Sequence, residues 1–128
     1  MPHLTIEYSA NVANWTNIEG LCDRLRREAL ATGVFPMAGI RVRAVRCEEY
    51  SIANGSPEFG FVDILVRLGA GRSAEVRQEA VGRLFRAAEN YLDVELQEWP
   101  LALSIEMREI DPEMSLKTGS VRKFLNEG

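Results

Sequence analysis

Apolar and polar side chains alternate at the start of the chain. This pattern predicts a half-buried strand over residues 3–8, whose apolar face is formed by Leu4, Ile6 and Tyr8. After an Asn-rich loop, Thr16 and Glu19 have the spacing of a capping box. A helix over about 17–31 should follow, ending near Gly33. Its apolar face is formed by Ile18, Leu21, Cys22, Leu25 and Ala29.

The two-residue period returns three times later in the chain. It predicts a second strand over 40–45, a third over 62–68 and a fourth over 103–107. Asn54-Gly55 is a strong turn signal between the second and third strands. We therefore expect a hairpin-like connection there.

A second helix is predicted over about 74–92. Ser73, at the end of a Gly-rich turn, is a suitable N-cap for it. Its apolar face is formed by Val81, Leu84, Phe85, Ala88 and Leu92. Near the end of the chain, Ser120 is placed to cap a short helix that carries Val121, Phe124 and Leu125.

The two halves of the chain repeat. A shift of 63 positions moves the apolar helix face that starts at Ile18 onto the one that starts at Val81. The same shift moves the apolar strand face that starts at Ile40 onto the one that starts at Leu103. We therefore predict one domain over 1–128, with pseudo-repeats over 2–52 and 60–110 and a tail over 111–128.

Each repeat has the order strand, helix, strand. A right-handed crossover between parallel strands places both helices on the same face of one common sheet. The predicted fold class is α/β (α+β), with two tandem β-α-β units that form a four-stranded sheet covered by two helices on one face.

The other face of this sheet has a mixed composition. Its apolar members are Val45, Cys47, Phe61 and Leu65, and its polar members are Thr5, Arg43, Asp63 and Glu106. This mixture is too polar for the core of a monomer and too apolar for free solvent. Partial burial against other subunits accounts for it, which predicts an oligomer.

Composition and charge exclude several classes of function. The net charge of −4 argues against nucleic acid as the main partner. No run of 18 apolar residues and no signal peptide is present, so we expect a cytoplasmic protein that does not enter a membrane. His3 is the only histidine, and Cys22 and Cys47 are too few for a disulfide framework, so we expect no metal site.

Pro2 is the first candidate for chemistry. Removal of Met1 would leave Pro2 with a secondary amine, which can act as a base. Burial and neighbouring cations lower the pKa of such an amine toward the range useful for general base catalysis. Chains that begin Met-Pro are common, but here the predicted strand starts at once and would fix the position of the amine.

Two arginines are the candidates for binding an anion. Arg72 lies in the turn just before the second helix, where its guanidinium and the free N–H groups of the helix can face one carboxylate. Arg41 opens the second strand on the face opposite Ile40, so its head group is not committed to the core. Taken alone, each of these arginines fits a solvated surface residue. Only their combination with Pro2 predicts a site.

Several segments resemble a known family. They are Pro-His after Met1, the stretches 31–41 and 69–73, Leu101–Ser104 and the stretch 116–125. Together they resemble the 5-carboxymethyl-2-hydroxymuconate isomerases of the tautomerase superfamily, the group that includes 4-oxalocrotonate tautomerase and macrophage migration inhibitory factor. The likeness covers nearly the whole chain.

The resemblance implies a homotrimer of duplicated β-α-β units without a cofactor. It implies that Pro2 moves a proton from the 2-hydroxyl group of a dienol to C-5, which gives the 2-oxo-3-ene isomer. Arg41 and Arg72 match the arginines that bind the carboxylates of a di- or tricarboxylate substrate. The implied pathway is aromatic catabolism through homoprotocatechuate, from 4-hydroxyphenylacetate.

Other functions remain open from the sequence. One is another reaction of the superfamily, namely a hydratase or dehalogenase, a decarboxylase or a phenylpyruvate tautomerase. Another is a trimeric binding module without catalysis, which retention of Met1 would favour because the Pro2 nitrogen would then be an amide without basicity. The state of the amino terminus separates this second alternative from an enzyme.

Overall fold

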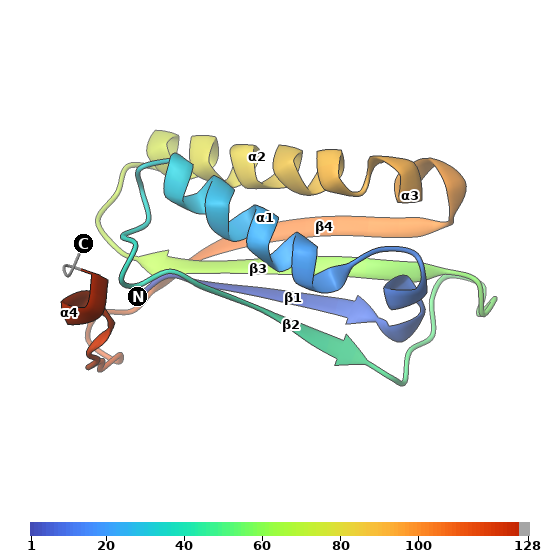
Figure 1. Ribbon diagram of the computed structural model, residues 1–128, viewed down its shortest axis with the longest axis horizontal. Helices are drawn as coiled ribbons and strands as arrows, with labels where there is room; N and C mark the ends of the chain where they lie inside the picture. Colours follow the sequence, from blue (N-terminus) through green and yellow to red (C-terminus); the bar gives the residue numbers. More distant parts are fainter. Residues whose placement is uncertain (126–128) are drawn as a thin grey trace.

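A four-stranded sheet with helices on one side forms the body of the chain (Figure 1). The computed structural model describes residues 1–125. The strands are β1 (His3–Ser9), β2 (Arg41–Cys47), β3 (Gly60–Gly69) and β4 (Leu101–Ile110). The helices are α1 (Ile18–Ala31), α2 (Ala74–Tyr91), α3 (Asp93–Glu98) and α4 (Val121–Leu125), with a 3-10 turn, η1 (Ala10–Asn14). The last three residues of the predicted 111–128 tail lie outside the described residues.

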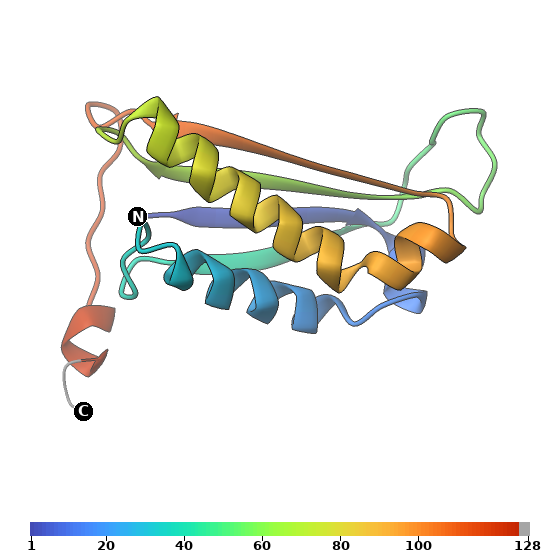
Figure 2. The ribbon, with the colours of Figure 1, turned by 90° about the horizontal axis from the view of Figure 1, so that it is seen from above.

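The strand order is β2-β1-β3-β4, and it contains two β-α-β units. β1 pairs parallel with β2, β3 pairs parallel with β4, and β1 and β3 pair antiparallel in the middle of the sheet. α1 and α2 connect the parallel pairs and lie on the same face (Figures 1 and 2). The predicted fold class is confirmed.

The expected hairpin between the second and third strands is wrong. β1 lies between β2 and β3, so the segment 48–59 crosses the end of the sheet instead of closing a hairpin. The turn at Asn54-Gly55 does form, since the Gly55 N–H donates to the Ile52 carbonyl at 2.8 Å and Gly55 has a φ of 89°. A local turn signal therefore does not decide which strands pair.

The core lies between the helices and the sheet. Leu4 pairs with Val66 and Ile6 with Ile64, and all four side chains are fully buried under the helices. Burial of each such side chain stabilises the fold by about 1.5–3 kcal/mol. The helices contribute the buried residues Leu21, Leu25, Ala29, Ala80, Leu84, Ala87 and Ala88.

The N-cap predicted from the sequence is observed at α2, whereas the N-cap of α1 differs from the predicted residue. Ser73 caps α2 as predicted, because its side chain accepts a hydrogen bond from the Val76 N–H. The N-cap of α1 is Asn17 and not Thr16, since the Asn17 side-chain oxygen accepts from the Gly20 N–H at 3.1 Å. Asn and Thr can both cap, and position 17 is the one with extended backbone next to the first helical residue.

The carboxy-terminal segment stands apart from the body (Figure 2). α4 forms as predicted, but it buries no residue. Val121, Phe124 and Leu125 are 51%, 64% and 43% exposed, so a large part of each apolar side chain remains in contact with solvent. Among residues 1–125, no helix is both long and apolar enough to cross a bilayer.

Candidate active site

The amino terminus lies at the end of the sheet where several segments meet. Because β1 is parallel to β2 and antiparallel to β3, the starts of β1 and β2 and the end of β3 share one end of the sheet. His3 pairs with Arg41 on one side and with Arg67 on the other. The Gly-rich loop from β3 to α2 lies at the same end as the amino terminus (Figure 1).

Pro2 is buried directly before the first residue of β1. A cavity of about 160 Å³ brings Pro2 together with Val34, Leu68 and Arg72. A Cβ atom at Gly39 would lie 3.0 Å from Pro2 Cδ, so the glycine permits the close approach of these two segments. The strand and this packing together fix the position of Pro2.

Arg72 is held in place by two backbone carbonyls. Its Nη2 donates to the Val34 carbonyl at 2.7 Å and its Nη1 to the Gly69 carbonyl at 3.2 Å. Gly71, just before it, has a φ of 115°, a conformation that favours glycine. A guanidinium has five N–H groups, so these two bonds orient Arg72 and leave others to bind an anion.

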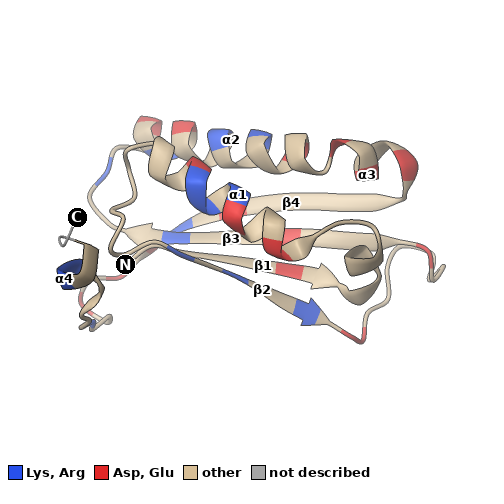
Figure 3. Cartoon of the chain, viewed as in Figure 1, with Lys and Arg blue, Asp and Glu red and all other residues tan. Residues whose placement is uncertain are grey.

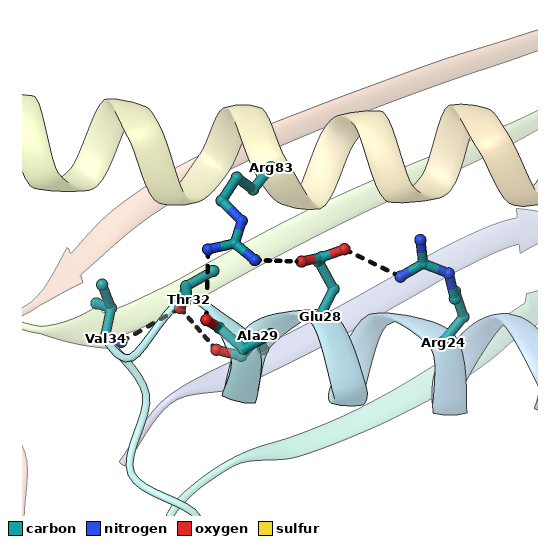
Figure 4. Close-up of polar contacts among 7 residues, drawn as sticks. Arg24, Glu28, Ala29, Thr32, Val34 and Arg83 are labelled. Carbon is teal, nitrogen blue, oxygen red and sulfur yellow. Dashed lines mark hydrogen bonds and ion pairs between the residues drawn. The ribbon is translucent and has the colours of Figure 1, made fainter.

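A polar network supports the segment that carries Val34 (Figure 4). Glu28 on α1 accepts hydrogen bonds from Arg24 at 3.1 Å and from Arg83 on α2 at 2.7 Å. Thr32, one turn further on, accepts from the Val34 N–H at 3.2 Å. The network joins the two helices and positions the carbonyl on which Arg72 rests. The guanidinium of Arg24, and then that of Arg83, lowers the pKa of the Glu28 carboxyl below its usual range.

Arg41 lines a neighbouring cavity, not the one that contains Pro2 and Arg72. This second cavity has a volume of about 390 Å³ and includes Met1, Gly39 and Lys117. Met1 and Lys117 also line the Pro2 cavity, so the two cavities adjoin at these residues. The structure therefore brings Pro2 and Arg72 into one cavity and places Arg41 in the next.

The candidate arginines are not neutralised by nearby acids. None of the ion pairs among residues 1–125 involves Arg41 or Arg72. Basic residues gather at the end of the molecule where the chain begins, on β3, in the loop before α2 and on the α4 segment (Figure 3). An anion that enters here meets positive charge although the chain as a whole is acidic.

The surroundings of the terminal amine of Met1 lower its pKa. Burial is the largest cause, followed by a hydrogen bond with Lys117 and the positive charges of Lys117, Arg41 and Arg67. Sequence reasoning did not identify Lys117 and Arg67 as part of the site. The strand register would have placed Arg67 beside His3, and Lys117 lies within the stretch 116–125 that carries part of the family likeness.

Comparisons with known proteins agree on one family. A model of the family described as CHMI, 5-carboxymethyl-2-hydroxymuconate isomerase, matches residues 2–125. A 5-carboxymethyl-2-hydroxymuconate Delta-isomerase of Escherichia coli is 34% identical over 121 residues, which cover 94% of this chain and 96% of that protein.

Solved structures agree. The crystal structure of a 5-carboxymethyl-2-hydroxymuconate delta-isomerase has a TM-score of 0.92 at 29% identity and covers 100% of this chain and 95% of that one. A 5-carboxymethyl-2-hydroxymuconate isomerase from Deinococcus radiodurans R1 has a TM-score of 0.89 at 34% identity, covering 97% and 93%. The W0 fused 4-OT, a wild-type symmetric trimer, shares the fold at a TM-score of 0.62 and 19% identity, covering 88% and 91%.

Proposed function

The chain belongs to the 5-carboxymethyl-2-hydroxymuconate isomerase family and is an isomerase, and on this premise we propose that it converts the dienol 5-carboxymethyl-2-hydroxymuconate into its 2-oxo-3-ene isomer. The O–H proton at C-2 is removed, the electron pair moves along the diene, and a proton is added at C-5. This balance requires no oxidant, reductant or cofactor. The name of the substrate places the reaction in the degradation of homoprotocatechuate, from 4-hydroxyphenylacetate.

Pro2 is the group that moves the proton in this proposal. Removal of Met1 turns its nitrogen from an amide into a secondary amine, which accepts the enol proton and returns it to C-5. Two features support this role: Pro2 is buried and fixed at the start of β1, and the amine of Met1, one residue before Pro2, already has a lowered pKa at this end of the sheet. The burial of Pro2 beside Arg72 is the single observation that carries the proposal.

Arg72 and Arg41 bind the carboxylates of the substrate in this proposal. Arg72 is oriented by Val34 and Gly69 within the Pro2 cavity, where its charge can also stabilise the oxygen that becomes the C-2 carbonyl. Arg41 lies in the adjoining cavity and can hold a more distant carboxylate. The two positions are consistent with an elongated substrate that has carboxylates at both ends.

The functional unit in this proposal is a homotrimer. The helix-free face of the sheet includes Val45, which is 44% exposed, and the half-buried Phe61 and Leu65. The apolar side of α4 is exposed as well. A second and third copy of the chain would cover both surfaces, and the trimeric fused 4-OT, which has the same fold, supports this arrangement.

The test of the proposal compares two forms of the protein. One form begins at Pro2, as verified by mass spectrometry, and the other carries uncleavable residues before Pro2. We expect the first to isomerise 5-carboxymethyl-2-hydroxymuconate, followed by the ultraviolet absorbance of the dienol, and the second to be inactive although folded. Equal rates for the two forms would overturn the role of Pro2.

A further inference from the structure

Lys117 lies where the candidate cavities meet. It belongs to the segment after β4, which passes the start of β1 on its way to α4 (Figure 1). It lines the Arg41 cavity, the cavity of Pro2 and Arg72, and a third cavity of about 170 Å³ beside Gly69. Among residues 1–125, Lys117 is therefore the one cationic side chain that lines the cavities of both candidate arginines.

Within residues 1–125, no acidic side chain lines the three cavities around Lys117. No ion pair among residues 1–125 involves Lys117. Lys117 is exposed and lies beside cavities that Arg41 and Arg72 also line, so its ammonium can bind an anion that enters them. The terminal amine in the same place has a charge of the same sign and does not compete for that role.

Met1 separates the three cavities. It lines each of them, and a Cβ atom at Gly119 would lie 3.7 Å from Met1 Cε, so the methionine fills the space between β1 and the segment of Lys117. Removal of Met1 would join these cavities. In the processed chain Arg41, Arg72 and Lys117 would then face one space that ends at the Pro2 amine.

We propose that Lys117 binds a third carboxylate and makes the site specific for tricarboxylates over dicarboxylates. This inference rests on the proposed function, whose substrate has the two carboxylates of muconate and one on the carboxymethyl branch. The proposed function assigns one carboxylate each to Arg41 and Arg72. Arg122 lines only the Arg41 cavity, whereas Lys117 lines both cavities and can reach a third carboxylate close to Pro2. A lysine on the tail segment is suited to a branch, because its ammonium is a point charge on a flexible stem.

The experiment uses Lys117→Gln, with Lys123→Gln as the matched control. These are the only lysines in the chain, and Lys123 lies over the Phe124 ring at 5.5 Å, away from the cavity linings. The kinetics of the processed protein are measured at a pH where the activity is on its plateau. The substrates are 5-carboxymethyl-2-hydroxymuconate, which has three carboxylates, and 2-hydroxymuconate, which has two.

Loss of the third contact should act mainly on the tricarboxylate. For Lys117→Gln we expect its kcat/KM to fall about tenfold to a hundredfold, chiefly through KM, since a charge-assisted hydrogen bond is lost. The kcat/KM for 2-hydroxymuconate should change less than about threefold. Lys117→Arg should recover most of the loss, and Lys123→Gln should behave as wild type with both substrates. An equal fall with both substrates, or no change with either, would overturn the proposal.

Binding separates this inference from the proposed function. Calorimetry with propane-1,2,3-tricarboxylate and with glutarate measures the same preference without turnover. We expect Lys117→Gln to weaken the tricarboxylate about tenfold or more and to leave glutarate unchanged. If the wild-type protein isomerises neither dienol but shows this pattern, the proposed reaction fails and the role of Lys117 stands. Unchanged tricarboxylate affinity in Lys117→Gln would refute that role whether or not the enzyme turns over.

Discussion

The arginines of this chain differ in what their head groups contact. Several of those on the helices, such as Arg24 and Arg83, pair with carboxylates, whereas the side chain of Arg72 donates to backbone carbonyls and Arg41 lies beside a cavity. A guanidinium without an acidic partner keeps its charge available for a ligand. Arg41 and Arg72, which form no ion pair among residues 1–125, also line the cavities at the amino terminus, and this combination marks them as candidate binding residues.

Replacement of either candidate arginine should impair catalysis without unfolding the protein. Arg41→Ala and Arg72→Ala each remove a charge-assisted contact of roughly 1.5–3 kcal/mol, so we expect kcat/KM to fall about tenfold to more than a hundredfold. The larger effect on kcat should belong to whichever arginine faces the developing oxyanion. Arg43→Ala is the control, because Arg43 is an exposed residue on the same strand as Arg41 and lines neither candidate cavity. If both variants keep wild-type kinetics, neither arginine binds substrate.

The pH dependence of the reaction should report the titration of the Pro2 amine. Below its pKa the amine is protonated and cannot accept the enol proton, so activity should rise with pH. Burial and the charges of Lys117, Arg41 and Arg67 lower the pKa of the Met1 amine. We expect the same surroundings to act on the Pro2 amine of the processed chain, so the rise should be complete near or below neutrality. Steady-state rates between about pH 5 and 9 check this, and a limb centred at the ordinary amine value near 8 would contradict it.

Among single residues, sequence reasoning identified those with a local signature. Pro2 follows the initiator methionine, and Arg72 lies in a Gly-rich turn before a helix. Lys117 carried no such signature, because its place beside Pro2 results from the path of the tail after β4. Met1, Arg41 and Arg72, which line the same cavities as Lys117, lie 116, 76 and 45 positions before it in sequence, and a period or a cap does not encode such distant contacts.

At the scale of elements, the carboxylate of Glu28 links α1 to α2 through an ion pair. Glu28 accepts from Arg24 on its own helix and from Arg83 on the other, and its side chain is only 18% exposed. Thr32 extends this network to Val34 and so to Arg72. The packing of the helices and the shape of the site are therefore linked.

Glu28→Gln should destabilise the protein at neutral pH by about 1 kcal/mol, which is the upper part of the range for partly exposed ion pairs. The pKa of Glu28 is lowered in the folded state, so its contribution is present above the unfolded pKa and is lost as the pH falls through the folded pKa. Guanidinium denaturation should show a larger difference between variant and wild type at pH 7 than at about pH 3. Asp23→Asn, which alters an exposed pair on the same helix, is the control. A difference that stays the same at both pH values would contradict the role of the charge.

Periodicity in the sequence predicted the strands, the two long helices and α4. It missed η1 and α3, which are short and lack a repeated apolar face, and it placed the cap of α1 one residue early. The hairpin was wrong for a different reason. Asn54-Gly55 specifies a turn, but the pairing of β2 with β1 depends on the burial of Val42 and Ala44 under α1 and not on the turn.

At the scale of the whole molecule, the two β-α-β units followed from the repeat in the sequence and from the handedness of crossovers. The antiparallel meeting of β1 and β3 did not follow, because no local pattern encodes it. Because of this antiparallel pairing, β1 and β2 start at one end of the sheet and β3 and β4 start at the opposite end. It explains why one end of the molecule contains the amino terminus, the α2 loop and the tail together.

We expect the chain to be a homotrimer in solution and the tail to hold it together. α4 presents Val121, Phe124 and Leu125 to solvent although each is apolar, and the helix-free face of the sheet exposes Val45. Contact with neighbouring copies would remove this surface from water, at about 25 cal/mol for each Å² of apolar area. Truncation after Thr118 keeps Lys117 and deletes α4, so it should weaken assembly without removing the third cation.

Light scattering coupled to size exclusion measures this outcome for both chains at micromolar concentration. The full chain should have three times the mass of the monomer, and the truncated chain should show a lower mass that increases with protein concentration. Phe124→Ser tests the same contact with a single change, since it removes the largest apolar side chain of α4 and leaves the chain length intact. Arg122→Ser on the same short helix is its matched control. A monomeric full chain would refute the trimer, and a truncated chain that stays trimeric would show that the sheet face assembles without the tail.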